Sequence, residues 1–161
     1  MSYFEKKNWC TGSGKDISFP EVVGHLKEYV SGGSKIFIGS DSFISNKKIC
    51  FSTAVCLYGP GQASRYFFIK QHTPKKDFSN LASRITEETR RSIEIACLLM
   101  GEHQLKRENI ELHLDVSPTS EGNATSKYSE MLKGYIQGYG INCKLKPFAW
   151  ASQSVADRHS K

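Results

Sequence analysis

The chain has 161 residues, of which 39% are hydrophobic and 24% are charged, with 22 Lys and Arg against 16 Asp and Glu. This length favours one domain with its own core, and this composition excludes a disordered tail, a collagen-like chain and a membrane span. The first ten residues carry charges where a signal peptide needs an apolar stretch, so we expect a cytoplasmic protein that does not contact membranes. The net charge of +6 favours a polyanionic partner.

The cysteines form no recognisable metal-binding or redox motif. Their number is odd, and their spacing contains neither a C-x-x-C pair nor a zinc-finger pattern. We therefore expect free thiols in a reducing compartment. The cysteines are Cys10, Cys50, Cys56, Cys97 and Cys143.

The first part of the chain predicts a helix followed by three strands. Residues 1–19 show no clear period and are expected to be a lead-in to a single domain over 20–161. Pro20 suits the first turn of a helix, apolar residues then recur on one face, and two consecutive glycines end it. Three β-branched and aromatic runs, separated by turn residues, then predict an antiparallel meander. These runs lie at 35–42, 47–59 and 64–71.

The second part of the chain predicts alternating helices and strands. Apolar residues recur with a helical or a strand period over successive segments. Strands joined through helices run parallel. We therefore expect an α/β fold with a mixed five-stranded sheet, three antiparallel strands followed by two parallel ones, flanked by helices. The expected segments are a helix at 79–101, a strand at 109–116, a helix at 124–139, a strand at 141–149 and a terminal helix at 150–161.

Two acidic residues lie at positions that are not typical of a charge on the solvated surface. Asp41 ends the first predicted strand, where open α/β sheets bind their ligands, although Asp is also common in turns. Glu88 lies at the centre of the apolar stripe of its helix, whereas Glu87 and Glu94 are expected to point toward solvent. A carboxylate in an apolar stripe needs a proton, a metal or a cationic partner. A buried pair of Glu88 with Arg or Lys is therefore the alternative to a metal site.

Two further acids are placed where they can join the first two. Asp115 closes the strand at 109–116 on the same face as His113, so it has the placement of Asp41 if the two strands are parallel neighbours. A water-facing strand is the alternative. Asp157 lies on the predicted terminal helix, which must cross the end of the sheet to bring this carboxylate close to the other acids. The alternative is that Asp157 is a charge on the surface of that helix.

Acids that converge in this way predict a metal site. Like charges repel one another, and a hard divalent cation with oxygen ligands is the usual means of offsetting this repulsion. Two Mg²⁺ or Mn²⁺ ions are the arrangement that supports in-line displacement at phosphorus. Together with the basic surface, the acids predict a metal-dependent nuclease that hydrolyses phosphodiester bonds.

The order of these motifs resembles that of a known family. The chain is similar to the ribonuclease H-like superfamily and, more narrowly, to the YkuK-like family of predicted ribonuclease H-like proteins. The resemblance implies an RNase H-like fold over nearly the whole chain, and it implies Asp41, Glu88, Asp115 and Asp157 as the metal-binding and catalytic acids. The motifs that carry it are IGSDS at 38–42, ETRRS at 88–92, HLDVSP at 113–118, KPFAWAS at 146–152 and VADRHSK at 155–161.

Other side chains are candidates for orienting the metal ligands or contacting substrate. The alternative for the histidines is a structural role, and the alternative for the lysines is a solvated surface. The glycine-rich stretch at 11–15 is not a phosphate-binding loop, because Trp9 stands where that motif requires its first glycine. The candidates are Ser42, His113, Lys146, His159 and Lys161.

Lysines and aromatic residues are interleaved over residues 42–76, which contain no acid. Such a hairpin suits the backbone and bases of a nucleic acid, whether RNA, DNA or a hybrid. The alternative is that the rings belong to the core and the lysines protect an edge strand. At the level of function, the alternative to a nuclease is a non-catalytic nucleic-acid-binding or scaffold module on the same fold.

Overall fold

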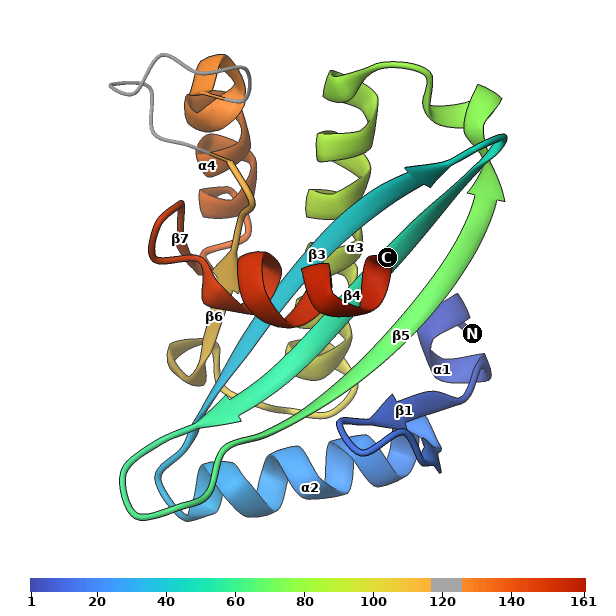
Figure 1. Cartoon of the computed structure of the whole chain (residues 1–161). Helices are drawn as coiled ribbons and strands as arrows, with labels where there is room; N and C mark the ends of the chain where they lie inside the picture. Colours follow the sequence, from blue (N-terminus) through green and yellow to red (C-terminus); the bar gives the residue numbers. More distant parts are fainter. Residues whose placement is uncertain (117–125) are drawn as a thin grey trace.

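A single mixed β-sheet runs through the molecule, with helices on both of its faces (Figure 1). The structure is a computed structural model that describes residues 1–116 and 126–161. The strand order is β2-β1-β5-β4-β3-β6-β7. The strands are β1 (Trp9–Thr11), β2 (Asp16–Ile17), β3 (Lys35–Ser45), β4 (Lys48–Tyr58), β5 (Arg65–Pro74), β6 (Ile110–His113) and β7 (Asn142–Lys144).

The predicted change from antiparallel to parallel pairing is confirmed. Strands β3, β4 and β5 form the antiparallel meander, β6 pairs parallel to β3, and β7 pairs parallel to β6. The prediction of five strands is wrong, because the sheet has seven. The two additional strands, β1 and β2, are three and two residues long, too short to show a strand period in the sequence. They extend the sheet beyond β5 through the pairing of Cys10 with Phe68.

The predicted helices are present, and hydrogen bonds at their N-termini explain where two of them begin. Ser18 and Glu21 form a reciprocal capping box at the start of α2, and Asn80 caps α3. The first two residues of the helix predicted at 124–139 lie outside the described residues. The helices are α1 (Tyr3–Lys6), α2 (Phe19–Ser31), α3 (Leu81–Gly101), α4 (Ser129–Gln137) and α5 (Asp157–Ser160), with a π-helical segment (Ala151–Ala156) leading into α5.

Alternate side chains of each central strand bury opposite faces of the sheet. Ile36 and Ile38 of β3 join the large core that α2, α3 and α4 cover, whereas Phe37 joins a smaller cluster on the other face. The π-helical segment and α5, which we call the terminal helix, cover this second face (Figure 1). None of the described helices combines the length and the apolar character needed to cross a membrane.

Gly39 of β3 determines where the terminal helix can cross the sheet. A Cβ atom at this position would lie 2.4 Å from the backbone nitrogen of Ser152 and 2.6 Å from the carbonyl carbon of Ala151. Real Cβ atoms do not approach other heavy atoms this closely, so the contact requires glycine. The helix backbone therefore rests directly on β3, two residues before Asp41.

Candidate active site

Asp41 lies on β3 beside the point where β6 ends. The parallel pairing of β3 with β6 stops at Gly39 and His113, and Asp41 follows two residues later with β4 as its partner through Ser52. The expectation that the strand ends at Asp41 is wrong, because β3 continues to Ser45 in the long hairpin with β4. One edge of β3 is nevertheless free of β6 at Asp41, so side chains from both faces of the sheet can reach it.

Glu88 reaches this open edge from α3, on the face of the large core. The Ser42 hydroxyl donates a hydrogen bond to Glu88 Oε2 at 2.5 Å. The pKa of Glu88 is raised to about 8, chiefly by burial and to a smaller extent by the charge of Asp115, although Ser42, Arg84 and Lys146 act in the opposite direction. The ion pairs of the described residues do not include Glu88, which argues against the alternative of a buried pair with Arg or Lys.

Asp115 and Asp157 complete the group from the other two elements. Asp115 follows the end of β6 and forms an ion pair with Lys146, with Nζ to Oδ1 at 2.9 Å. Asp157 is the first residue of α5, and Lys161 Nζ lies 3.3 Å from its Oδ2. Ser160, one turn later, donates a hydrogen bond to Asp41 Oδ2 at 3.3 Å and so joins the terminal helix to β3.

The electrostatics of Asp41 show how closely the acids are placed. Its pKa is raised to about 9, chiefly by burial and next by the charge of Glu88. A hydrogen bond with Asp157 raises it as well, and Asp115 does so through both its charge and a hydrogen bond. A hydrogen bond between two carboxyl groups requires that one of them keeps its proton. Four carboxyl groups from four separate elements therefore act on one another at this edge, which we call the acid cluster.

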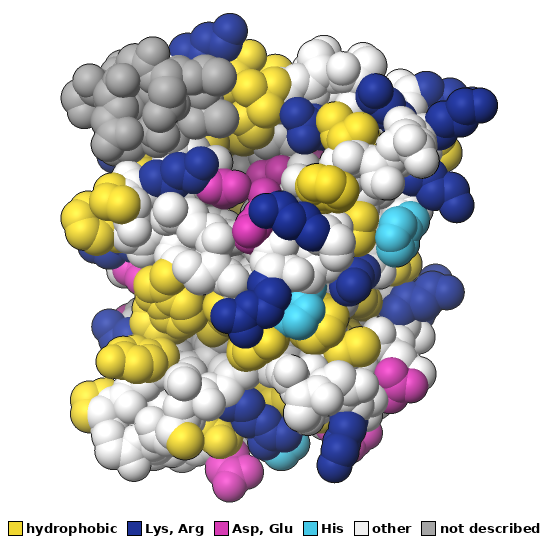
Figure 2. Space-filling model, viewed as in Figure 1, with side chains coloured by type: hydrophobic (Ala, Val, Ile, Leu, Met, Phe, Trp, Pro, Cys, Tyr) yellow, Lys and Arg dark blue, Asp and Glu magenta, His cyan; other side chains and the backbone are white. Residues whose placement is uncertain are grey.

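The chemistry of the acid cluster fits divalent metal ions. All four groups offer oxygen only, the ligand that Mg²⁺ and Mn²⁺ prefer, and the raised pKa values of Asp41 and Glu88 reflect burial without enough countercharge. Within the described ranges, no three of these groups place oxygens within 4.8 Å of one another. Mutually repelling carboxylates are expected to draw together only around a cation. Figure 2 shows carboxylates gathered on this side of the molecule with Lys and Arg around them.

A second group of possible metal ligands lies far from the acid cluster. Ligand atoms of Glu5, Glu102 and His103 come within 4.8 Å of one another, where α1 meets the end of α3. Glu102 follows Glu88 by 14 positions, about 20 Å along the helix axis. This second group is therefore separate from the acid cluster.

Glu87 has a different role from its neighbour Glu88. The expectation that Glu87 points to solvent is wrong, because its side chain is only 12% exposed and its Oε2 lies 2.8 Å from Nε of the buried Arg91. Arg91 packs over the ring of Phe51 at 4.4 Å and could not be left without a carboxylate there. Arg90, which is more exposed, bridges Glu87 and Glu94.

Substitution of the two adjacent glutamates is expected to have opposite effects on stability. At neutral pH without metal, Glu87→Gln is expected to lower the free energy of unfolding by about 2 kcal/mol, because Arg91 loses its partner. Glu88→Gln is expected to leave stability unchanged or raised, because it removes a charge that burial disfavours. Urea unfolding in EDTA measures both effects. Equal destabilisation by the two substitutions would contradict the assignment of different roles.

The two candidate histidines have structural partners. His113 is buried; its Nδ1 accepts a hydrogen bond from the Ala151 N–H, so Nε2 carries the proton that Glu111 accepts. Burial lowers the pKa of His113, which favours this neutral form. His159 stacks on Phe68, with ring centroids 3.7 Å apart. Both histidines hold the terminal helix on the sheet. They therefore have the structural role that the sequence left open as the alternative to contacting substrate.

The candidate lysines and Ser42 lie at the acid cluster itself. Lys146 and Lys161 pair with Asp115 and Asp157, and Ser42 contacts Glu88. Ser160 could not be predicted from the sequence, because a serine three positions from an acid on a helix carries no signal of its own. The pairing of Glu87 with Arg91 could not be predicted either, because periodicity alone does not assign partners to two successive glutamates.

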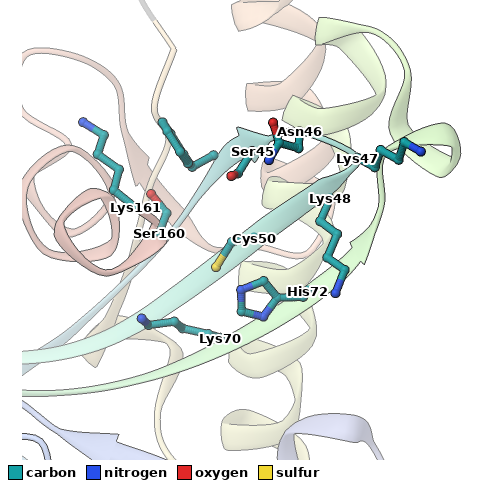
Figure 3. A pocket seen from close by; sticks show the side chains of 10 residues that line it. Ser45, Asn46, Lys47, Lys48, Cys50, Lys70, His72, Ser160 and Lys161 are labelled. Carbon is teal, nitrogen blue, oxygen red and sulfur yellow. The ribbon is translucent and has the colours of Figure 1, made fainter.

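A groove opens beside the acid cluster, between the terminal helix and the β3–β5 meander (Figure 3). It has a volume of about 930 Å³, and its lining includes Ser160, the last residue of the terminal helix, and Lys161, which follows it. The alternative that the aromatic residues of 42–76 belong to the core is true of some of them: Phe51, Phe67 and Phe68 are buried. Phe43 is 40% exposed and lines the groove together with lysines.

The mixed strand pairing around β3 is consistent with the class of α/β protein that the sequence motifs indicated. The Ribonuclease H-like family model matches residues 19–161, and the chain belongs to that family. It is 25% identical to the "Uncharacterized protein YkuK" of Bacillus subtilis (strain 168) over 162 residues, which cover 90% of this chain and 92% of that protein. No solved structure gives a significant match.

Proposed function

We propose that the chain is a metal-dependent nuclease that hydrolyses phosphodiester bonds of nucleic acid. The observation that carries this proposal is the acid cluster. Within it, Glu88, Asp115 and Asp157 all contribute to raising the pKa of the buried Asp41. The charge of Asp115 also contributes to raising the pKa of Glu88. A protein does not bring such groups together for stability, because each adds repulsion and desolvation. Perturbed acids of this kind concentrate at functional sites, and membership of the ribonuclease H-like family supports nuclease chemistry.

In this proposal the acid cluster holds two Mg²⁺ or Mn²⁺ ions. Such a pair supplies the positive charge that supports the attacking and the leaving oxygen in an in-line displacement. Ser42 and Ser160 fix the direction of the Glu88 and Asp41 carboxylates through their hydrogen bonds. Lys146 and Lys161 now pair with Asp115 and Asp157, and where these carboxylates hold metal instead, both ammonium groups would be available to contact phosphate oxygens.

Cleavage assays with the Asp41→Asn variant test this function. The native chain is incubated with Mg²⁺ or Mn²⁺ and a panel of hybrid, duplex, single-stranded and branched nucleic acids. Cleavage of at least one substrate is expected, and Asp41→Asn is expected to reduce its rate at least about 100-fold, the scale on which one electrostatic stabiliser acts. Glu28→Gln, which removes an exposed acid on α2, serves as the control and should retain the native rate.

Two results would count against the proposed function. Cleavage that persists unchanged in Asp41→Asn would mean that the acid cluster does not catalyse it. Salt-dependent binding of nucleic acid without cleavage of any substrate would instead favour a non-catalytic binding module on the same fold.

A further inference from the structure

A continuous basic surface leads away from the acid cluster along the β3–β4 hairpin. The groove beside the terminal helix shares Asn46 and Lys47 with a second groove of about 590 Å³ at the tip of the hairpin. We call the two grooves together the basic tract. None of the described residues that line the two grooves is acidic. The lysines of the tract are Lys47, Lys48, Lys70, Lys75, Lys76 and Lys161.

The positive charge of the basic tract is not neutralised within the protein. Among the residues that the structure describes, Lys161 alone of these lysines forms an ion pair. Figure 3 shows Lys48 on β4 and Lys70 on β5, with Lys161 across the groove, directly after the terminal helix. A row of unpaired lysines along one path matches a ligand whose negative charges repeat along a chain.

The basic tract is joined directly to the acid cluster. Ser160 lines the groove and donates its hydrogen bond to Asp41, and Lys161 lines the groove and pairs with Asp157. A strand whose phosphate lies at the acid cluster can therefore continue into the groove. The tract extends in one direction from the site of cleavage, over the hairpin.

Exposed rings in the groove favour an unpaired strand over a duplex. Phe43 lies two residues after Asp41 on the same face of β3, about 7 Å further along the strand, and its ring is 40% exposed. His72 is exposed in the same groove. Bases in a duplex are stacked on each other, whereas an unpaired strand offers base faces that stack on such rings.

We propose that the basic tract binds a single-stranded stretch of nucleic acid next to the bond that is cut. The lysines hold its phosphates, and the base beside the scissile phosphate stacks on Phe43. The substrate is then a single strand or a duplex with an unpaired tail, and a blunt duplex is a poor substrate. This inference rests on the proposed nuclease function for the position of the cut, but the binding of the tract to a single strand can be tested without cleavage.

Binding of a fluorescein-labelled thymidine oligonucleotide of about 20 nucleotides, long enough to span the tract, tests the lysines. Anisotropy titrations in EDTA compare it with a blunt DNA duplex of the same length, and the single strand is expected to bind at least about 10-fold more tightly. In the double variant Lys48→Glu, Lys70→Glu, binding of the single strand should weaken at least about 10-fold. The slope of log K against log salt should fall by about 1.4, about 0.7 for each lysine.

A second substitution tests the ring separately from the charge. Phe43→Ala is expected to weaken binding of the single strand by about fivefold or more while leaving the salt slope unchanged. Tyr135→Ala on α4, which removes a ring that is 45% exposed and outside the tract, is the matched control and should bind as the native chain does. The pair Lys27→Glu, Lys106→Glu makes the same change of charge at exposed positions away from the tract.

The outcomes separate this inference from the proposed function. Equal weakening in the tract variant and in the Lys27, Lys106 control would overturn the tract as a binding site. Binding of the blunt duplex as tightly as the single strand would overturn the preference for an unpaired strand. Either result leaves the cleavage assay with Asp41→Asn unaffected. Tract-dependent binding without metal-dependent cleavage would support the tract and refute the nuclease.

Discussion

The Asp41→Asn variant is expected to be more stable than the native chain when metal is absent, and to gain nothing when metal is added. Asp41 ionises near pH 3.8 when unperturbed, and the fold raises its pKa to about 9. Between these two pH values the folded chain binds more protons than the unfolded chain, so stability falls as pH rises through this window. Asn keeps the neutral character of the protonated acid without this cost.

The expected size of the effect is large because each pKa unit corresponds to about 1.4 kcal/mol. Near the upper end of the window we expect Asp41→Asn to raise the free energy of unfolding by about 2 kcal/mol or more, which is about 4–8 °C in Tm for a chain of this size. Mg²⁺ or Mn²⁺ at about 100 times its Kd should raise the Tm of the native chain by about 5–10 °C. The variant should show little of this increase.

Thermal unfolding at several pH values, in EDTA and with saturating metal, measures all of these quantities. The Tm of the metal-free native chain should fall as pH rises toward about 9, and the fall should be shallower in Asp41→Asn. Glu28→Gln should follow the native curve. A lower Tm for Asp41→Asn at every pH would mean that Asp41 belongs to a stabilising network, and the metal site would be wrong.

A member of the acid cluster could be predicted from the sequence where a carboxylate interrupts an otherwise apolar pattern. Glu88 was separable from Glu87 because it alone lies on the apolar stripe of α3, and the structure places only Glu88 beside Asp41. The partners of Glu87 could not be predicted in this way. Its ion pair with Arg91 depends on the Phe51 ring of β4, a contact between residues far apart in the chain.

The central strands and helices were predictable because they are long enough to show their period, and the short elements were not. Strand β1 forms because β5 offers it an edge, as the pairing of Thr11 with Phe67 shows, and β2 forms on the free edge of β1. The same limit applies to Asp41, whose strand continues to Ser45 because the hairpin partner β4 continues beside it. Whether a residue such as Asp41 lies in a turn or in a strand depends on whether a partner strand runs beside it. The local sequence does not contain that partner, so it cannot distinguish the two cases.

Substitution of Gly39 is expected to displace the terminal helix and with it Asp157. Alanine favours strands more than glycine does, so intrinsic propensity alone would make Gly39→Ala neutral or stabilising. The new Cβ would instead meet backbone atoms of Ser152 and Ala151 at 2.4–2.6 Å, and backbone cannot move aside as a side chain can. We expect Gly39→Ala to lower the free energy of unfolding by about 3 kcal/mol, at the upper end of the range for overpacking.

The effect of Gly39→Ala should extend to the acid cluster, because the terminal helix carries Asp157 and Ser160 to Asp41. The increase in Tm on adding Mg²⁺ should therefore be smaller in Gly39→Ala than in the native chain, although the variant is folded below its own Tm. Gly24→Ala on α2, where a Cβ meets no atom within 4 Å, is the matched control and should raise stability by up to about 1 kcal/mol. If Gly39→Ala kept both the native Tm and the native response to metal, the terminal helix would not depend on this contact, and the position of Asp157 would need another explanation.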